Sequence, residues 1–323
     1  MILESILVVT FALILDLLIG DPKNRFHPTS WIGILIAKLV PLTKNESAKI
    51  EKTGGIILVI TVSAFIGALL VLLNTGIQSL TVEPITLIIS IIVGVLLLKS
   101  TIAIRGMEKH AMAVMDSIEK NDLDSARTNL SMIVKRNTTN LDKNHLLSGT
   151  LESISENTVD GITGPLFYFT FFGIPGAFIY RIINTFDSMI GYKTDLFRNV
   201  GWFGANCDKV LNYLPARITS LLMVLGAMLL GNNWKKSYHI MKRDARNTES
   251  PNAGYPMAAL AGALGTRFEK IDHYSVGEGD IELTKSHLKS AIALMKVTSI
   301  LFCGIFTIPL IIILYYLGWW IHA

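Results

Sequence analysis

The stretch GGIILVITVSAFIGALLVLL, residues 54–73, decides the fold because it contains no charged side chain. Its length matches the roughly 20 residues that an α-helix needs to cross the hydrocarbon core of a bilayer. Similar apolar runs occupy 2–19 and 297–317, and the run 85–98 reaches this length when it is extended to Ile104. The sequence therefore predicts a helical membrane protein.

The composition supports this class. Hydrophobic residues make up 51% of the chain, charged residues only 17%, and the mean hydropathy is +0.48, whereas about a quarter of the residues are charged in soluble domains. Cys207 and Cys303 lie far apart, so they indicate neither a disulfide framework nor a metal site.

Two further apolar segments are less regular. The segment 166–183 contains Gly173 and Pro175, and 218–230 is short; each is either a short span or a re-entrant helix surrounded by protein. The first run, 2–19, lacks a basic start and a small-residue cleavage site, which favours a retained helix over a signal peptide. We expect an all-α, polytopic membrane protein with about four to six membrane segments, re-entrant ones included.

Basic residues give the orientation. Lys and Arg are frequent in 21–53, 99–160 and 232–294, but absent from 74–84 and after Leu317. The positive-inside rule then places the three basic regions in the cytoplasm and both termini outside. The net charge of +4 follows from this topology and requires no nucleic-acid partner.

The region 99–160 no longer resembles a membrane segment. Its polar and apolar residues follow helical spacing, with breaks at 121–122 and 137–140, which predicts two or three amphipathic helices. We expect one membrane-embedded domain, 1–323, with 99–160 and 232–294 as cytoplasmic helical insertions.

The first polar motif is Asp16-Leu-Leu-Ile-Gly-Asp21-Pro, followed by His27-Pro28 and Trp31-Ile-Gly33. An ionisable group within an apolar helix is costly and suggests function. The alternative is that Asp16 is hydrated near the interface and that Asp21-Pro22 ends the helix.

The second motif is Glu152-Ser-Ile-Ser-Glu156-Asn157-Thr-Val-Asp160-Gly161. On an α-helix its three carboxylates share one face, where like charges repel. Such a face requires a compensating cation: Mg²⁺, an arginine or an amine substrate. The alternative is a solvated acidic face.

Three more motifs follow. Arg181 to Tyr192 carries polar groups along one helical edge, which is either a site or the wet side of an interfacial helix. Asn206-Cys-Asp208 precedes Pro215-Ala216-Arg217, where Arg217 either binds phosphate or extends to the membrane interface. Asp244-Ala-Arg246 leads into the turn-rich Ser250-Pro251-Asn252-Ala-Gly254 and a small-residue helix, where an ordinary connecting turn is the alternative. No P-loop, G-x-S-x-G or H-E-x-x-H motif is present in the sequence.

In this order and at this spacing, the motifs D-x-x-x-G-D-P, E-S-x-x-E-N-x-x-D-G, N-T-x-D-S-M-x-G-Y, P-A-R and S-P-N-A-G-Y-P resemble the adenosylcobinamide-phosphate synthase family of cobalamin biosynthesis (CobD/CbiB). The resemblance runs from Asp16 to about Gly279. It implies a carbon–nitrogen ligase of the cell membrane that joins aminopropanol, or its O-phosphate, to the free propionate carboxylate of adenosylcobyric acid. ATP and Mg²⁺ are implied by the reaction, and a homo-oligomer or an association with other enzymes of the pathway is a further expectation.

The resemblance also implies site residues. Glu156, Asp160 and Asp187 are expected to hold Mg²⁺ or to deprotonate the attacking ammonium group, and Arg217 and Arg246 to bind phosphate. The 250–254 loop would contact the corrin amides. The residues expected to bind substrate are Asp16, Asp21, Glu152, Asn157, Asn184, Ser188, Tyr192, Arg217, Asp244, Arg246, Ser250 and Asn252.

The sequence departs from the family pattern at Asn137, at 247–249 and after Gly265, which affects the substrate details more than the reaction type. A corrinoid transporter or a non-catalytic corrinoid-binding protein is the alternative, since broken helices beside polar residues are also typical of transporters. A full span at 166–183 would place the Asn184 motif outside. A joint cytoplasmic site therefore requires that 166–183 and 218–230 are re-entrant or otherwise bring this motif back to the cytoplasmic side.

Overall fold

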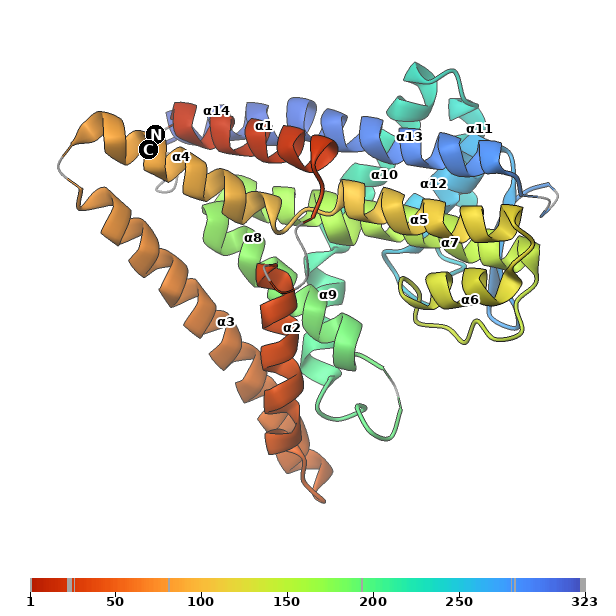
Figure 1. Ribbon diagram of the computed structural model, residues 1–323, viewed down its shortest axis with the longest axis horizontal. Coiled ribbons are helices and arrows are strands. Elements are labelled where there is room, and N and C mark those ends of the chain that lie inside the picture. The colour runs from red at the N-terminus through yellow and green to blue at the C-terminus, as the bar shows by residue number, and fades with distance from the viewer. Residues whose placement is uncertain are drawn as a thin grey trace. The chain divides into compact units, whose positions relative to one another are not determined.

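The computed structural model describes residues 2–21, 25, 27–80, 82–192, 194–279, 281 and 283–319. Almost all regular structure is helical (Figure 1). In chain order the elements are α1 (Ile2–Leu18), α2 (Pro28–Leu39), η2 (Val40–Thr43), α3 (Ala48–Gln78), α4 (Glu83–Lys99), α5 (Ile104–Glu119), α6 (Leu123–Ser131), α7 (Lys143–Thr158), η3 (Val159–Thr163), α8 (Gly164–Ile190), α9 (Trp202–Leu211), α10 (Tyr213–Leu229), α11 (Trp234–Asp244), α12 (Gly254–Leu264), β1 (Arg267–Lys270), β2 (Tyr274–Gly277), α13 (Lys285–Leu301), η4 (Phe302–Thr307) and α14 (Ile308–Tyr316).

The helices confirm the predicted class. Within the described residues, four helical stretches are long and apolar enough to cross a membrane: Ala48–Gln78, Glu83–Glu119, Lys143–Ile190 and Lys285–Tyr316. A fifth arises if α9 and α10, which are bent by 43° at a short break, form one span. With 17 residues, α1 lies at the lower end of the usual length range for a span. The sidedness of the helices and of the two termini stays a prediction.

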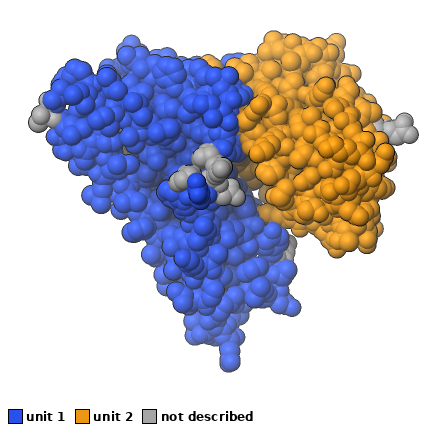
Figure 2. Space-filling view, in the orientation of Figure 1, with its two compact units in different colours: residues 1–103, 164–211, 305–323 blue, residues 104–163, 212–304 orange. Residues whose placement is uncertain are grey.

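The chain divides into two compact units, coloured separately in Figure 2. Unit 1 contains residues 1–103, 164–211 and 305–323, and unit 2 contains 104–163 and 212–304. Unit 2 therefore includes most of the two segments predicted as cytoplasmic insertions. The single membrane-embedded domain stays a prediction.

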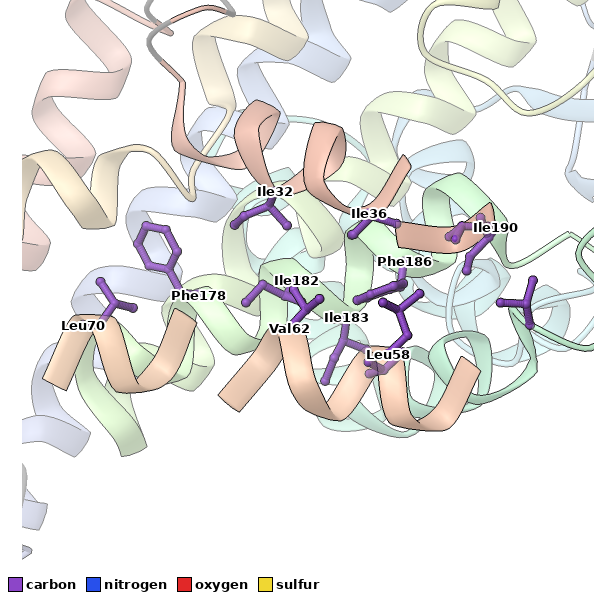
Figure 3. Packing of buried hydrophobic residues seen from close by; sticks show 13 residues of the cluster. Ile32, Ile36, Leu58, Val62, Leu70, Phe178, Ile182, Ile183, Phe186 and Ile190 are labelled. Atoms are coloured by element: carbon purple, nitrogen blue, oxygen red, sulfur yellow. The ribbon is translucent and has the colours of Figure 1, made fainter. Parts of the chain in front are cut away.

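The core of unit 1 lies between α2, α3 and α8 (Figure 3). Ile32 and Ile36 of α2 are buried against Leu58 and Val62 of α3 and Phe186 of α8. The helix α2 was not predicted, because it lies within the basic stretch 21–53 and is too short to stand out by length. Its apolar side nevertheless follows the i, i+4 spacing of an amphipathic helix.

The helix α8 turns back on itself at Gly173. There the backbone adopts φ 62° and ψ −154°, which is accessible to glycine, and Pro175 follows. The rings of Tyr168 and Tyr180 stack with centroids 5.3 Å apart, and a Cβ atom on Gly164 would lie 2.3 Å from the Tyr180 hydroxyl. In a straight helix, residues 12 positions apart are separated by about 18 Å along the axis. The arms 164–172 and 174–190 therefore run back along each other, as a re-entrant segment requires.

In unit 2 the predicted helices of the 99–160 region are α5, α6 and α7, with breaks at the predicted positions. The small residues of α12 allow a close approach to α11: a Cβ atom on Gly262 would lie 2.7 Å from the Lys236 carbonyl oxygen. The Ser237 hydroxyl also donates to the Ala259 carbonyl across this contact, at 2.7 Å. The two-stranded hairpin β1–β2, paired from Arg267 to Gly277, was not predicted.

Candidate active-site residues in the two units

Glu152 of α7 lies at the centre of a buried hydrogen-bond network in unit 2. Its side chain is 2% exposed and accepts hydrogen bonds from Arg136, from the Ser148 hydroxyl at 2.9 Å and from the Tyr274 hydroxyl at 2.7 Å. The sequence predicted Mg²⁺, an arginine or an amine substrate as the cation for this motif, and Glu152 contacts an arginine. Burial raises the pKa of Tyr274, and the neighbouring Glu152 carboxylate raises it further. The Tyr274 hydroxyl therefore stays protonated at neutral pH and donates a hydrogen bond to Glu152.

The remaining acidic residues of this motif have different surroundings. Glu156 is exposed and Asp160 is half-buried, whereas Glu152 is buried. Glu152 and Glu156 lie four residues apart on α7 and so share one face, whereas Asp160 lies in the π-helical turn Val159–Thr163 that follows. Such turns change the register of the side chains that follow and often occur at functional sites. The Asn157 amide donates to the Ser153 carbonyl at 2.9 Å.

The P-A-R and S-P-N-A-G-Y-P motifs meet at Arg217. One terminal nitrogen of its guanidinium donates to the Tyr213 carbonyl at 2.6 Å and to the Asn252 side-chain oxygen at 3.1 Å, and the other lies 3.5 Å from the Pro251 carbonyl. The guanidinium carbon lies 3.5 Å from the Tyr213 ring centroid and 4.4 Å from that of Tyr255. Of the five N–H donors of a guanidinium, these contacts occupy three. Two donors remain to bind an anion such as phosphate.

The same unit links this cluster to the acidic motif. The Thr163 hydroxyl of η3 and the Thr219 hydroxyl of α10 are 2.6 Å apart. Asp160 precedes the first of these threonines by three residues, and Arg217 precedes the second by two. A buried hydrogen bond in unit 2 thus joins the residues that directly follow two of the predicted motifs.

Asp244 anchors the hairpin. Its buried carboxylate accepts hydrogen bonds from Arg243 and, at 2.9 Å, from the Gly277 backbone N–H. Burial alone would raise the pKa of Asp244, but the hydrogen bonds from Arg243 and Gly277 and the nearby positive charges outweigh it and lower the pKa. Arg246 is exposed, and the Ser250 hydroxyl accepts hydrogen bonds from the N–H groups of Asn252 and Ala253 at 3.3 Å.

In unit 1, Lys99 contacts both aspartates of the first motif. Its ammonium nitrogen lies 2.8 Å from Asp21 Oδ1 and 3.6 Å from Asp16 Oδ1. His27 Nε2 lies 3.4 Å from the same Asp21 oxygen. Burial would raise the pKa of Asp21, but the hydrogen bonds and charges of His27 and Lys99 outweigh it and lower the pKa. Asp16 is fully buried, which contradicts the alternative of a hydrated interfacial side chain. The alternative also had Asp21-Pro22 ending the helix, and Pro22 lies outside the described residues.

The third motif forms a second polar cluster in unit 1. The buried Asn184 side chain accepts a hydrogen bond from Arg181 at 3.2 Å and donates one to Asp208 at 3.2 Å. The N-C-D motif is thereby joined to the N-T-x-D-S motif. Asp187 is half-buried on the same helix.

Ser188 and Tyr192, the last two predicted site residues of this motif, lie near the end of α8. The exposed Ser188 side chain donates to the Asn184 carbonyl at 2.8 Å. The Tyr192 ring lies beside that of Phe197, with centroids 6.4 Å apart.

Comparison with known proteins identifies the family. The CobD/CbiB protein family model matches residues 9–297. This chain belongs to the CobD/CbiB family. It is 43% identical over 300 residues, 93% of this chain and 96% of the relative, to a probable cobalamin biosynthesis protein CobD of Methanothermobacter thermautotrophicus. It is 35% identical over 319 residues, 98% of both chains, to the probable CobD of Methanocaldococcus jannaschii. It is 36% identical over 277 residues, 85% of this chain and 88% of the relative, to the CobD of Dehalococcoides mccartyi. No solved structure matches the chain.

Membership of the CobD/CbiB family confirms the predicted resemblance and the role in cobalamin biosynthesis. Several residues of the clusters were nevertheless missed by the sequence reasoning: Lys99, Arg136, Tyr213, Tyr255 and Tyr274. Tyr255 lies within a motif already noted, and Lys99 is a single charge at the end of an apolar run; both signals were available. Arg136 and Tyr274 are 16 and 122 residues from Glu152, so local spacing gave no sign of them.

Proposed function

We propose that this protein is an ATP-dependent ligase that forms the amide bond between the free propionate of adenosylcobyric acid and the amine of aminopropanol or its O-phosphate. Membership of the CobD/CbiB family supports the pathway, and the order of the five motifs supports the reaction. The observation that carries the proposal is the Arg217 cluster, which joins two of these motifs and retains donors for an anion.

The proposed reaction has two steps. A carboxylate oxygen attacks the γ-phosphorus of ATP, which releases ADP and forms an acyl phosphate. The amine nitrogen, after its ammonium form has lost one proton, attacks the acyl carbon, and phosphate leaves with the second proton. Such steps depend mainly on the positioning of the phosphates and the stabilisation of their charge.

Within unit 2, Glu156 and Asp160 suit Mg²⁺, because this ion usually takes one or two protein carboxylates and completes its shell with water and substrate phosphates. Among the residues that the structure describes, no group of three or more His, Cys, Asp or Glu side chains is arranged to hold a metal. The proposed Mg²⁺ therefore depends on oxygens of the nucleotide. When bound, it would neutralise charge on the transferred phosphoryl group. The role of Asp187 as a ligand or base is a hypothesis from its sequence motif.

The proposal is tested by mass spectrometry on the purified protein in nanodiscs, with adenosylcobyric acid, ATP, Mg²⁺ and either amine. We expect a product with the mass of the amide that requires ATP. Its formation should be lost in Glu156→Gln and retained in the matched control Glu46→Gln, since Glu46 is an exposed loop residue. A folded wild-type protein that binds corrinoid but forms no amide would refute the proposal.

The alternative function, corrinoid transport, is favoured by one observation. The helix break at Gly173 gives α8 the broken geometry found in transporter binding sites. Uptake of corrinoid into liposomes that contain the protein, without ATP or amine, would support transport, whereas amide formation without uptake would support the ligase.

A further inference from the structure

The outer face of α11 carries aromatic and basic residues that the proposed function leaves unexplained. Trp234, Tyr238 and Lys242 follow one another at intervals of four residues, so they share one edge of the helix. Lys235 and His239 are exposed beside them. The ammonium nitrogens of Lys235 and Lys242 lie 5.7 and 5.6 Å from the ring centroids of Trp234 and Tyr238. We call these five residues the α11 stripe.

The other side of α11 is packed within unit 2. The Ser237 hydroxyl donates to the Ala259 carbonyl of α12 at 2.7 Å, and Ile240 and Met241 are buried. The helix is therefore held in place, and the stripe remains exposed, with Trp234 at 41% and Tyr238 at 44%. Tryptophan and tyrosine gather at surfaces where an apolar ring and a polar group are both accommodated, such as the membrane interface.

The stripe is also cationic. Lys236 and Arg243 of the same helix pair with Glu278. Lys235 and Lys242, by contrast, form no ion pair with a carboxylate in the part of the chain that the structure describes. The exposed residues of α11 include no carboxylate. The stripe therefore combines exposed rings with uncompensated positive charge, which complements a surface of anionic phospholipid headgroups.

The stripe begins close to a candidate membrane segment. The helix α10, half of the bent pair that is apolar enough to enter a membrane, ends at Leu229. Leu229 and Leu230 are 60% and 40% exposed. Trp234 follows Leu230 by four residues, a length of chain that reaches at most about 14 Å. The first turn of α11 thus starts within reach of the headgroup layer, which is roughly 5–7 Å thick on each side of the bilayer.

We propose that the α11 stripe binds the surface of the bilayer, with Trp234 and Tyr238 at the level of the headgroups and Lys235 and Lys242 at the phosphates of anionic phospholipids. Part of the segment 232–294, predicted as a cytoplasmic insertion, is then a membrane-surface element. This inference does not depend on the ligase reaction.

Spin-label accessibility tests the inference on the full-length protein in nanodiscs. The label is placed at Tyr238→Cys, in a background where Cys207 and Cys303 are serine. An identical label at Lys143→Cys, on an exposed residue of unit 2 outside the stripe, is the matched control. In nanodiscs that contain anionic phospholipid, we expect oxygen to reach the label at 238 more readily than a polar nickel chelate does, and the reverse at 143.

A second measurement tests the charges. Lys235→Gln/Lys242→Gln should lower the ratio of immersed to solvated label at 238 by about 30-fold in these nanodiscs, since each lysine near an anionic surface contributes roughly fivefold to binding. The matched control is Lys109→Gln/Lys120→Gln, which changes two exposed lysines of the same unit. It should leave the ratio unchanged.

Three results would overturn the inference. One is a label at 238 that the nickel chelate reaches as readily as at 143. Another is a label that neither probe reaches, because a second copy or another protein would then cover the stripe. The third is equal immersion in nanodiscs of zwitterionic lipid alone, unchanged in the lysine variant, because anionic headgroups would then not be the partner. Each result holds whether or not the protein forms the amide.

Discussion

The reversal of α8 at Gly173 can be tested by cross-linking its two arms. Replacing Tyr168 and Tyr180 by cysteine, in a background where Cys207 and Cys303 are serine, places one thiol on each arm. The two tyrosine rings stack with centroids 5.3 Å apart. Because tyrosine rings can stack while their Cα atoms lie further apart than the roughly 7 Å that a disulfide requires, the two thiols are joined by a flexible bifunctional cross-linker. Its reach is about 10 Å, whereas a straight helix would separate these residues by about 18 Å. The two geometries therefore predict opposite results.

The assay is treatment of intact membranes with the thiol cross-linker, followed by proteolysis and mass spectrometry. We expect the 168–180 cross-link to form. The pair Val8→Cys/Gly94→Cys, at the close contact of α1 and α4, is the positive control. The pair Tyr168→Cys/Ile190→Cys is the negative control, because residue 190 lies about 15 Å further along the second arm.

Failure of the 168–180 pair to cross-link, while the α1–α4 pair does, would refute the reversal. Success would have a consequence for the candidate site. The second arm returns to the level at which the first arm begins, so Asn184 and the residues after it start from the same side of the membrane as Gly164. The segment 166–183 would then return the Asn184 motif to the side on which it began, as a joint cytoplasmic site requires.

Three other predictions concern stability. Tyr274→Phe removes one hydrogen bond to the Glu152 carboxylate and should lower the free energy of unfolding by about 1.5–3 kcal/mol in thermal or denaturant unfolding. Gly262→Val forces a side chain into the backbone of α11 and should cost about 1–3 kcal/mol by the same measurement, while Gly76→Val, with open space around it, should not. Because the pKa of Asp244 is lowered on folding, its ionised form stabilises the protein above its ordinary pKa of 3.8 and this contribution is lost as the pH falls through the lower, folded value. The difference in melting temperature between wild type and Asp244→Asn should therefore be present at pH 7 and shrink towards pH 3; a constant difference would contradict this.

Much of the fold could be predicted because long apolar runs have few alternatives. The run 54–73 became the centre of α3, and 85–98 became α4 almost residue for residue. The helices α2 and α9 were missed, since 10–12 residues of mixed polarity among basic loops carry little periodic signal. The hairpin was missed for a similar reason: its strands have four residues each and are held by side chains from distant helices.

The candidate site was predicted as a set of motifs but not as a set of contacts. The pairings Arg217–Asn252 and Asn184–Asp208 join motifs that the sequence lists separately. Sequence spacing alone did not distinguish Glu152, Glu156 and Asp160 from one another. In the structure they differ, because Glu152 is buried and bound by Arg136, 16 residues earlier, Glu156 is exposed, and Asp160 lies in the π-helical turn.

This separation changes how the motif residues should be interpreted. The oxygens of Glu152 accept hydrogen bonds from Arg136, Ser148 and Tyr274, and those of Asp244 from Arg243 and Gly277. Since Tyr274 and Gly277 are the two ends of β2, both carboxylates fasten the same strand to α7 and α11. A carboxylate engaged in this way would have to break buried hydrogen bonds to bind a substrate or a metal ion. The structure thus gives Glu152 and Asp244 a role in the placement of the hairpin, whereas the exposed side chain of Glu156 is accessible to a substrate.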